Sequence, residues 1–170
     1  MNAMKAPFKT WLVSLCLLPG MAEAQERCAI EKAVFTEAEA GTTLSFRPVG
    51  SDSAAVSHLF TITGGKLKLD GHIMYDEETR RPGGMVMNNC PEGDATGAEL
   101  RACTIWTGVP YILDVATGHI DILGPEGSEA PDAILMPGFG PAIRHSALWD
   151  KSGLRQVPWD LYEFKECKAA

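Results

Sequence analysis

The chain has 170 residues, a formal net charge of −7 and no long basic run. This length suits one ordinary domain with a hydrophobic core of its own. The acidic balance argues against binding nucleic acid or anionic lipid through a charged patch, so we expect no nucleic-acid partner.

The first 24 residues have the three parts of a secretory signal peptide. Two lysines precede the apolar run of residues 11–18, and Ala22 and Ala24 put small residues where a signal peptidase reads the chain. The apolar run is far shorter than the ~20 residues that cross a bilayer. We therefore expect cleavage before Gln25, a single mature domain over residues 25–170, no stable membrane anchor, and a periplasmic or secreted location.

The cysteines agree with an oxidising compartment. One of the five lies in the predicted signal, which leaves Cys28, Cys90, Cys103 and Cys167 for two disulfides. Cys90 and Cys103 bracket a turn-rich stretch, whereas Cys28 and Cys167 lie near the two ends of the mature chain, which tend to be close in compact domains. The preferred pairing is therefore Cys28–Cys167 and Cys90–Cys103. No Cys-x-x-Cys pair is present, so we expect no cysteine metal site.

The clearest secondary structure is β. Residues 42–49 predict a strand that is halted by Pro48, and residues 58–63 and 66–75 alternate apolar with polar side chains on either side of a Gly-Gly turn. The Asp70-Gly71 step within the second of these strands is either a further turn or a bulge.

The second half of the chain mixes strands with short helices. Residues 99–106 fit a helix or a strand equally well, and residues 111–123 predict a hairpin that turns at Gly118. Residues 141–149 predict a helix with proline at its first position, and residues 157–164 predict a last strand. The fold class is therefore mainly β, a sandwich or small barrel built from antiparallel hairpins with one or two short helices. A β-rich α+β domain is the alternative.

Two glycine-containing strings mimic binding loops. Residues 92–97 match the first half of a calcium loop, but Cys103 stands where that loop needs a bidentate glutamate. Residues 138–143 open a helix as a phosphate-binding loop does, but Pro141 removes one of the N–H donors. We interpret both as structural turns and expect no bound metal and no cofactor.

The histidines give weak candidates for a ligand site. His72 and His119 fall on the polar faces of their strands, and Asp121 shares the face of His119, where the two could form a surface metal or acid–base pair. His58 shares its strand phase with Phe60, which predicts a half-buried position.

His145 is the other candidate, because Trp149 and Asp150 follow it near the end of the predicted helix. Ser146 cannot face it as a nucleophile, since adjacent helical residues point about 100° apart. Stacking of His145 on Trp149 at i+4 is the simpler interpretation.

No nucleophile motif occurs in the sequence, and no catalytic residue is predicted. We therefore expect a non-enzymatic binding or interaction domain whose partner is an envelope protein or a small ligand, with hairpin loops as its contact surface. The alternative is a small periplasmic hydrolase with a site near His145 or Asp121.

Overall fold

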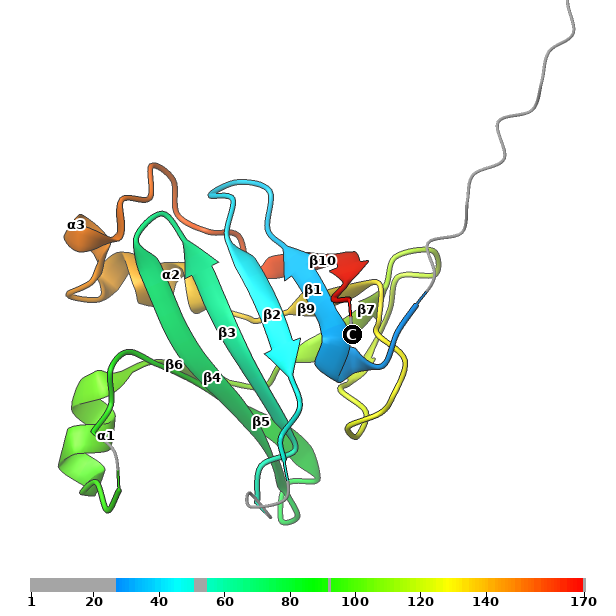
Figure 1. The fold of residues 1–170 in the computed structure, drawn as a ribbon, viewed down its shortest axis with the longest axis horizontal. Helices are drawn as coiled ribbons and strands as arrows, with labels where there is room; N and C mark the ends of the chain where they lie inside the picture. Colours follow the sequence, from blue (N-terminus) through cyan, green and yellow to red (C-terminus); the bar gives the residue numbers. More distant parts are fainter. Residues whose placement is uncertain (1–26, 51–54, 92, 170) are drawn as a thin grey trace, which may run out of the picture.

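The computed structural model of the chain describes residues 27–50, 55–91 and 93–169 (Figure 1). The predicted signal peptide lies outside these ranges. Within them, ten strands form one antiparallel sheet in the order β6-β5-β4-β3-β2-β1-β10-β9-β7-β8. The strands are β1 (Ala33–Thr36), β2 (Thr43–Arg47), β3 (His58–Gly64), β4 (Leu67–Asp76), β5 (Arg81–Met87), β6 (Thr104–Gly108), β7 (Tyr111–Asp114), β8 (His119–Ile122), β9 (Ala133–Leu135) and β10 (Leu161–Cys167).

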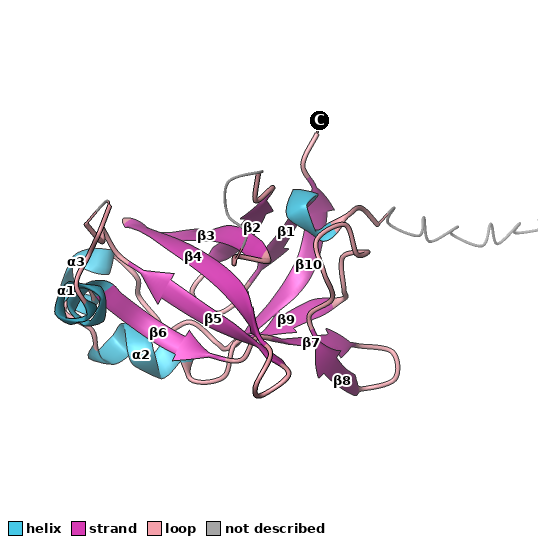
Figure 2. Cartoon of the chain, turned by 90° about the horizontal axis from the view of Figure 1, so that it is seen from below, coloured by secondary structure: helices cyan, strands magenta, loops and turns pink. Residues whose placement is uncertain are grey.

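The sheet curls into a half-barrel, which confirms the mainly β prediction. It is a single open sheet in the described residues, neither a two-sheet sandwich nor a closed barrel. The α-helices α1 (Gly97–Cys103), α2 (Phe139–His145) and α3 (Trp149–Ser152) are short, and a single 3-10 turn, η1 (Ile30–Lys32), precedes β1. Figure 2 shows the three α-helices gathered at one end of the sheet and the β7–β8 hairpin at the other.

Strand periodicity explains the core. On β3 and β4 the alternate residues that the sequence predicts to be apolar face inward, and Phe60, Ile62, Leu69 and Ile73 are all buried. The hairpin between these strands turns at Gly65 and Lys66, one residue later than the predicted Gly64-Gly65 pair, because Gly64 still belongs to β3 and pairs with Leu67. The register runs without interruption from His58 to Gly64.

Gly71 is neither in a turn nor in a bulge, so both interpretations of the Asp70-Gly71 step were wrong. It pairs directly with Phe60 in an uninterrupted ladder, and a Cβ at Gly71 would lie only 2.2 Å from the Phe60 ring. The glycine is needed because the Phe60 ring approaches the backbone of β4 too closely to leave room for a side chain at residue 71.

α1 and β6 account for the ambiguous segment at residues 99–106, which is helix up to Cys103 and strand from Thr104. Thr96 caps the helix: its hydroxyl accepts the N–H of Glu99, and the Glu99 carboxylate accepts the N–H of Thr96. This reciprocal capping box fixes the start of α1.

The predicted helix at residues 141–149 is two helices. α2 begins two residues earlier than expected and ends before Ser146, whose extended backbone (ψ 158°) separates it from α3. The break occurs because the Ser146 hydroxyl donates to the carbonyl of Ile143 and also accepts the N–H of Leu148, so it bonds backbone groups on both sides of the interruption.

The last strand begins four residues later than predicted. Residues 157–160 lie against the start of α2, where a Cβ on Gly140 would meet the Pro158 carbonyl oxygen at 2.0 Å. β10 then continues to Cys167 because β1 pairs with it along its length.

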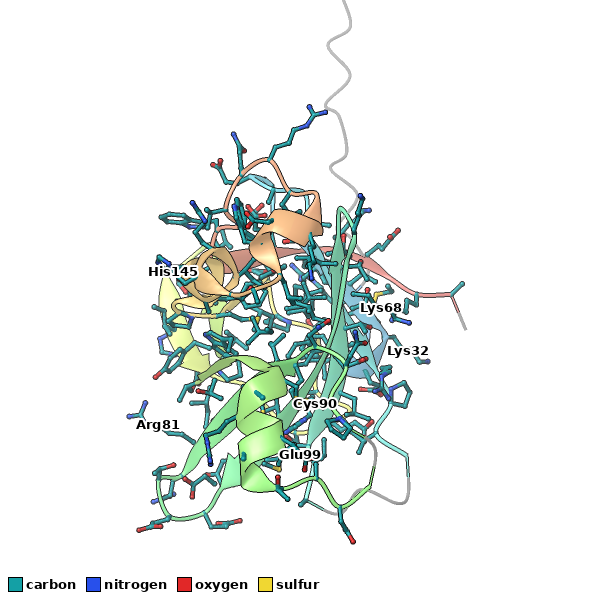
Figure 3. The ribbon with its side chains drawn as sticks, turned by 90° about the vertical axis from the view of Figure 1, so that its left-hand side faces the viewer. Lys32, Lys68, Arg81, Cys90, Glu99 and His145 are labelled. Carbon is teal, nitrogen blue, oxygen red and sulfur yellow. A yellow bond between two sulfur atoms is a disulfide. The ribbon has the colours of Figure 1, made fainter. Side chains whose placement is uncertain are left out.

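Both predicted disulfides are present. Cys28–Cys167 closes a separation of 139 residues, and Cys90–Cys103 joins the segment after β5 to the end of α1 across 13 residues. Figure 3 shows Cys90 beside α1, the helix that carries Glu99.

Candidate ligand-binding groove

A groove of about 880 Å³ lies over the face of β4, β5 and β6 that points away from the core. His72 and Met74 of β4 line its floor and pair with Met85 and Gly83 of β5, and Met85 pairs in turn with Thr107 of β6. This volume is within the range of small-molecule sites, which is about 300–1,000 Å³.

The groove is hollow because a glycine lies at its centre. Gly83 stands opposite Met74, and a Cβ at Gly83 would meet nothing closer than the Met74 carbonyl oxygen at 3.8 Å. Met74 itself is 40% exposed. Because methionine is flexible and polarisable, it adapts to ligands of irregular shape. The floor is thus apolar and adaptable on a sheet face that is usually polar.

The remaining lining is mostly apolar, with one imidazole. Val56, which precedes β3, and Val109, which follows β6, add branched side chains. His72 is half-buried, and desolvation by this burial lowers the pKa of its imidazole. His72 is therefore neutral at pH 7 and offers a hydrogen bond, not a charge, to a molecule in the groove.

A second hollow adjoins the groove at the β4–β5 hairpin, near the lower end of these strands in Figure 1. It shares Tyr75 and Arg81 with the groove and adds Tyr111 of β7 and both Ile120 and Asp121 of β8. Tyr75 is 44% exposed and Ile120 is 52% exposed, so apolar surface continues from the groove into this hollow.

Arg81 stands at the junction of the two hollows. It pairs with Asp76 in the ladder, but the Asp76 carboxylate accepts the hydroxyl of Thr79 at 2.9 Å and the N–H groups of Glu78 and Thr79. These hydrogen bonds, that of the Thr79 hydroxyl foremost, lower the pKa of Asp76. The Arg81 guanidinium instead donates from Nη1 to the hydroxyl of Tyr111 at 3.2 Å.

The residues predicted around His145 do not form a site in the described part of the chain. His145 is exposed and makes no hydrogen bond or ion pair there, and Figure 3 shows it at a different place on the surface from Arg81. The expected stacking on Trp149 was wrong, because the helix break intervenes and Arg144 lies over that ring instead, 5.0 Å from its centroid. Asp150 is exposed on α3.

The His119–Asp121 pair lies on one face of β8, as predicted. The imidazole and carboxylate are 3.9 Å apart, and their side chains are 72% and 61% exposed. Asp121 also lines the second hollow, so one of the predicted candidates borders the groove system. Over residues 27–50, 55–91 and 93–169, no three His, Cys, Asp or Glu side chains gather closely enough to hold a metal ion.

The two glycine-containing strings are structural. In the first, Thr96 is used as the helix cap and Ala95 donates to the carbonyl of Gly93, while residue 92 lies outside the described ranges. In the second, the N–H groups of Gly138 and Gly140 donate to the carboxylate of Asp160 at 2.6 and 2.9 Å. The protein's own carboxylate thus occupies the position that a phosphate would take.

The groove was not predicted from the sequence, although the outward-facing residues of β4 and β5 give a signal for it. On the outward phase of β4 the polar series ends at Met74, and the outward phase of β5 continues with Gly83 and Met85. Apolar or absent side chains at successive outward positions of paired strands indicate a surface that is built for contact.

Comparison with protein-family models, with curated proteins and with solved structures finds no match to this chain. In the part of the chain that the structure describes, no helix has the length and apolar character required to cross a membrane.

Proposed function

We propose that this chain is an exported, non-enzymatic binding domain that holds a small, largely apolar molecule in the groove over β4, β5 and β6. The observation that carries the proposal is the hollow formed by Met74, Gly83 and Met85 on a sheet face where polar side chains are expected. Of the two kinds of partner that the sequence left open, its volume favours a small ligand over an envelope protein.

The lining residues support binding more than hydrolysis. His72 is the one imidazole among the described lining residues. The nearby Ser57 hydroxyl donates to the Ile73 carbonyl and contacts the ring of His58, so it is not arranged as a nucleophile for His72. The four described cysteines are all in disulfides.

Export is supported by the two disulfides, which persist in oxidising compartments, and by the signal-like pattern of the first 24 residues. Intact-mass measurement of the product made in a secreting host tests this part of the proposal. We expect a chain that begins at Gln25 and gains two hydrogens per bridge on reduction. A product that retains the first 24 residues would contradict it.

Binding is tested with N-phenyl-1-naphthylamine, a neutral apolar dye that fluoresces when it leaves water. We expect saturable binding to the wild type, and binding weakened about tenfold or more by Gly83→Leu, since the new side chain fills the hollow. Thr63→Leu is the matched control: it places the same side chain on an exposed strand position outside the groove and leaves binding unchanged. Equal affinity of the wild type and Gly83→Leu would exclude the groove as the binding site.

A further inference from the structure

The groove leads at the β4–β5 hairpin to a cation that has no carboxylate partner. Arg81 lines both hollows, and the one hydrogen bond of its guanidinium in the described structure goes to the uncharged hydroxyl of Tyr111. Arginine pairs bidentately with carboxylates where one is within reach. The cross-strand neighbour Asp76 also lines the groove, but its carboxylate is bonded to Thr79 and Glu78 within the hairpin, and no ion pair joins it to Arg81 among the described residues.

The other two carboxylates that line the hollows, those of Asp121 and Glu77, form no ion pair with Arg81 among the described residues. Asp121 accepts its neighbour's N–H, that of Ile122, at 2.7 Å and lies 3.9 Å from the imidazole of His119. Glu77 is an exposed residue of the hairpin tip that lines the groove, and no ion pair joins it to Arg81 among the described residues. A second arginine, Arg80, also lines the second hollow and adds positive charge there.

An apolar groove that ends at an unpaired guanidinium is complementary to an amphiphile with an anionic head. Resting on the proposed function, we infer that the ligand is a single-chain carboxylate, with its hydrocarbon over Met74 and Met85 and its head group at Arg81. The Tyr111 hydroxyl is a positioning group, since it holds the guanidinium at the junction. A bidentate carboxylate would use the donors that Tyr111 leaves free.

The test uses three ligands with the same twelve-carbon chain, dodecanoate, dodecanol and dodecyltrimethylammonium, each titrated against bound N-phenyl-1-naphthylamine at concentrations below micelle formation. We expect dodecanoate to displace the dye at a concentration about tenfold lower than dodecanol. The cationic ligand is expected to be the weakest. The advantage of dodecanoate over dodecanol is expected to shrink as salt is added.

Variants locate the head group. Arg81→Gln is expected to abolish the preference for dodecanoate over dodecanol, because the guanidinium that pairs with the carboxylate is lost. Arg81→Lys keeps the charge and part of the preference, and Tyr111→Phe reduces the preference by an intermediate factor. Arg101→Gln, on α1 and outside both hollows, removes the same charge and is expected to have no effect.

The outcomes separate this inference from the proposed function. If dodecanol displaces the dye as well as dodecanoate does, or if Arg81→Gln keeps the preference, the anionic head is wrong and the apolar groove stands. A preference for the ammonium ligand would also overturn the inference, since Glu77 and Asp121 would then set the local charge. If the wild type binds neither the dye nor any of the three ligands, both proposals fail.

Discussion

Asp160 determines how the segment after α3 meets the start of α2. Its two carboxylate oxygens accept the N–H groups of Gly138 and Gly140, which are among the unpaired donors at the beginning of that helix. The negative charge is also favourable beside a helix N-terminus. One side chain thus holds residues 157–160 against the start of α2. It also accepts two N–H groups of the loop that resembles a phosphate site.

Replacing Asp160 with alanine is expected to lower the free energy of unfolding by about 1–2 kcal/mol, because both N–H groups lose their acceptor. Urea unfolding measures the effect. Asp94→Ala is the control, since Asp94 is exposed, lies outside the helices and has no side-chain hydrogen bond among the described residues, and its unfolding midpoint is expected to stay at the wild-type value. If the two variants unfold at the same urea concentration, Asp160 does not hold the turn.

His58 is the most deeply buried histidine of the described residues, at 3% exposure. Its Nδ1 contacts the hydroxyl of Ser57 at 3.0 Å and its ring meets the Phe46 ring edge-on, but Nε2 has no hydrogen-bond partner there. Desolvation lowers the pKa of His58 below its ordinary value of 6.5, although the charges of Glu126 and Glu31 and the carbonyl of Pro125 act in the opposite direction.

Stability is therefore expected to fall in mild acid. Between the lowered pKa of folded His58 and 6.5, the unfolded chain binds a proton that the folded chain does not, so the free energy of unfolding is highest above this window and decreases as the pH drops through it. Urea unfolding at a series of pH values from about 8 to 5 measures the decrease.

His58→Phe removes the titrating group and is expected to flatten part of this dependence, with His72 accounting for a remainder of the same sign. A His58→Phe profile that parallels the wild type would show that burial of this imidazole does not govern the acid response.

At the scale of the strands, substitutions at two glycines with opposite surroundings test how the Phe60 ring packs against β4. A Cβ on Gly71 would lie 2.2 Å from the Phe60 ring, whereas one on Gly83 would stand in the open groove. Gly71→Ala is expected to cost about 2–3 kcal/mol of unfolding free energy, since the ring must move within a packed core. Gly83→Ala is expected to be neutral or slightly stabilising, because alanine restricts the unfolded chain. Similar unfolding midpoints for the two variants would contradict the packing described for Phe60.

Strands with a clean period of two were predictable, and those without it were not. β3 and β4 alternate and were predicted, with the turn placed one residue too early, whereas β1 is buried along three successive residues and β9 has only three residues. β5 was hidden by Pro82 and by two glycines; pairing with β6 begins only at Gly84, so Pro82 lies where β5 has no β6 partner.

The helices show what local patterns leave undecided. Residues 99–106 were left open between helix and strand. The capping box of Thr96 and Glu99 was not used, although it marks the start of α1, and the change to β6 at Thr104 depends on pairing with β5, which is distant in the sequence. The end of α2 depends on the hydrogen bonds of one serine. The groove depends on which outward residues of three strands meet, so only single traces such as Met74 were visible in the sequence.

At the scale of the whole molecule, the two disulfides differ in the length of chain that they constrain. Loop-closure entropy predicts that Cys28–Cys167, across 139 residues, stabilises the fold by about 5 kcal/mol, and that Cys90–Cys103, across 13 residues, does so by about 3 kcal/mol. Urea unfolding of the two paired Cys→Ser variants measures the difference.

The shorter bridge is also expected to act locally. α1 has no buried residue, so loss of Cys90–Cys103 should raise amide hydrogen exchange in α1 more than in β3 and β4. The prediction is contradicted if the Cys90–Cys103 variant is the less stable of the two, or if exchange rises evenly over the sheet. The short bridge would then stabilise the sheet as well as α1.

The groove as a ligand site is the central claim, and the methionine methyl groups report on it directly. In the ¹³C-methyl NMR spectrum of the labelled protein, titration with dodecanoate is expected to shift the signals of Met74 and Met85, which line the groove. The signal of Met136, which is 1% exposed in the core, should stay in place. Shifts of Met74 and Met85 that saturate together would establish the site, and unmoved signals for both, while dodecanoate binds, would place the ligand elsewhere and contradict the account.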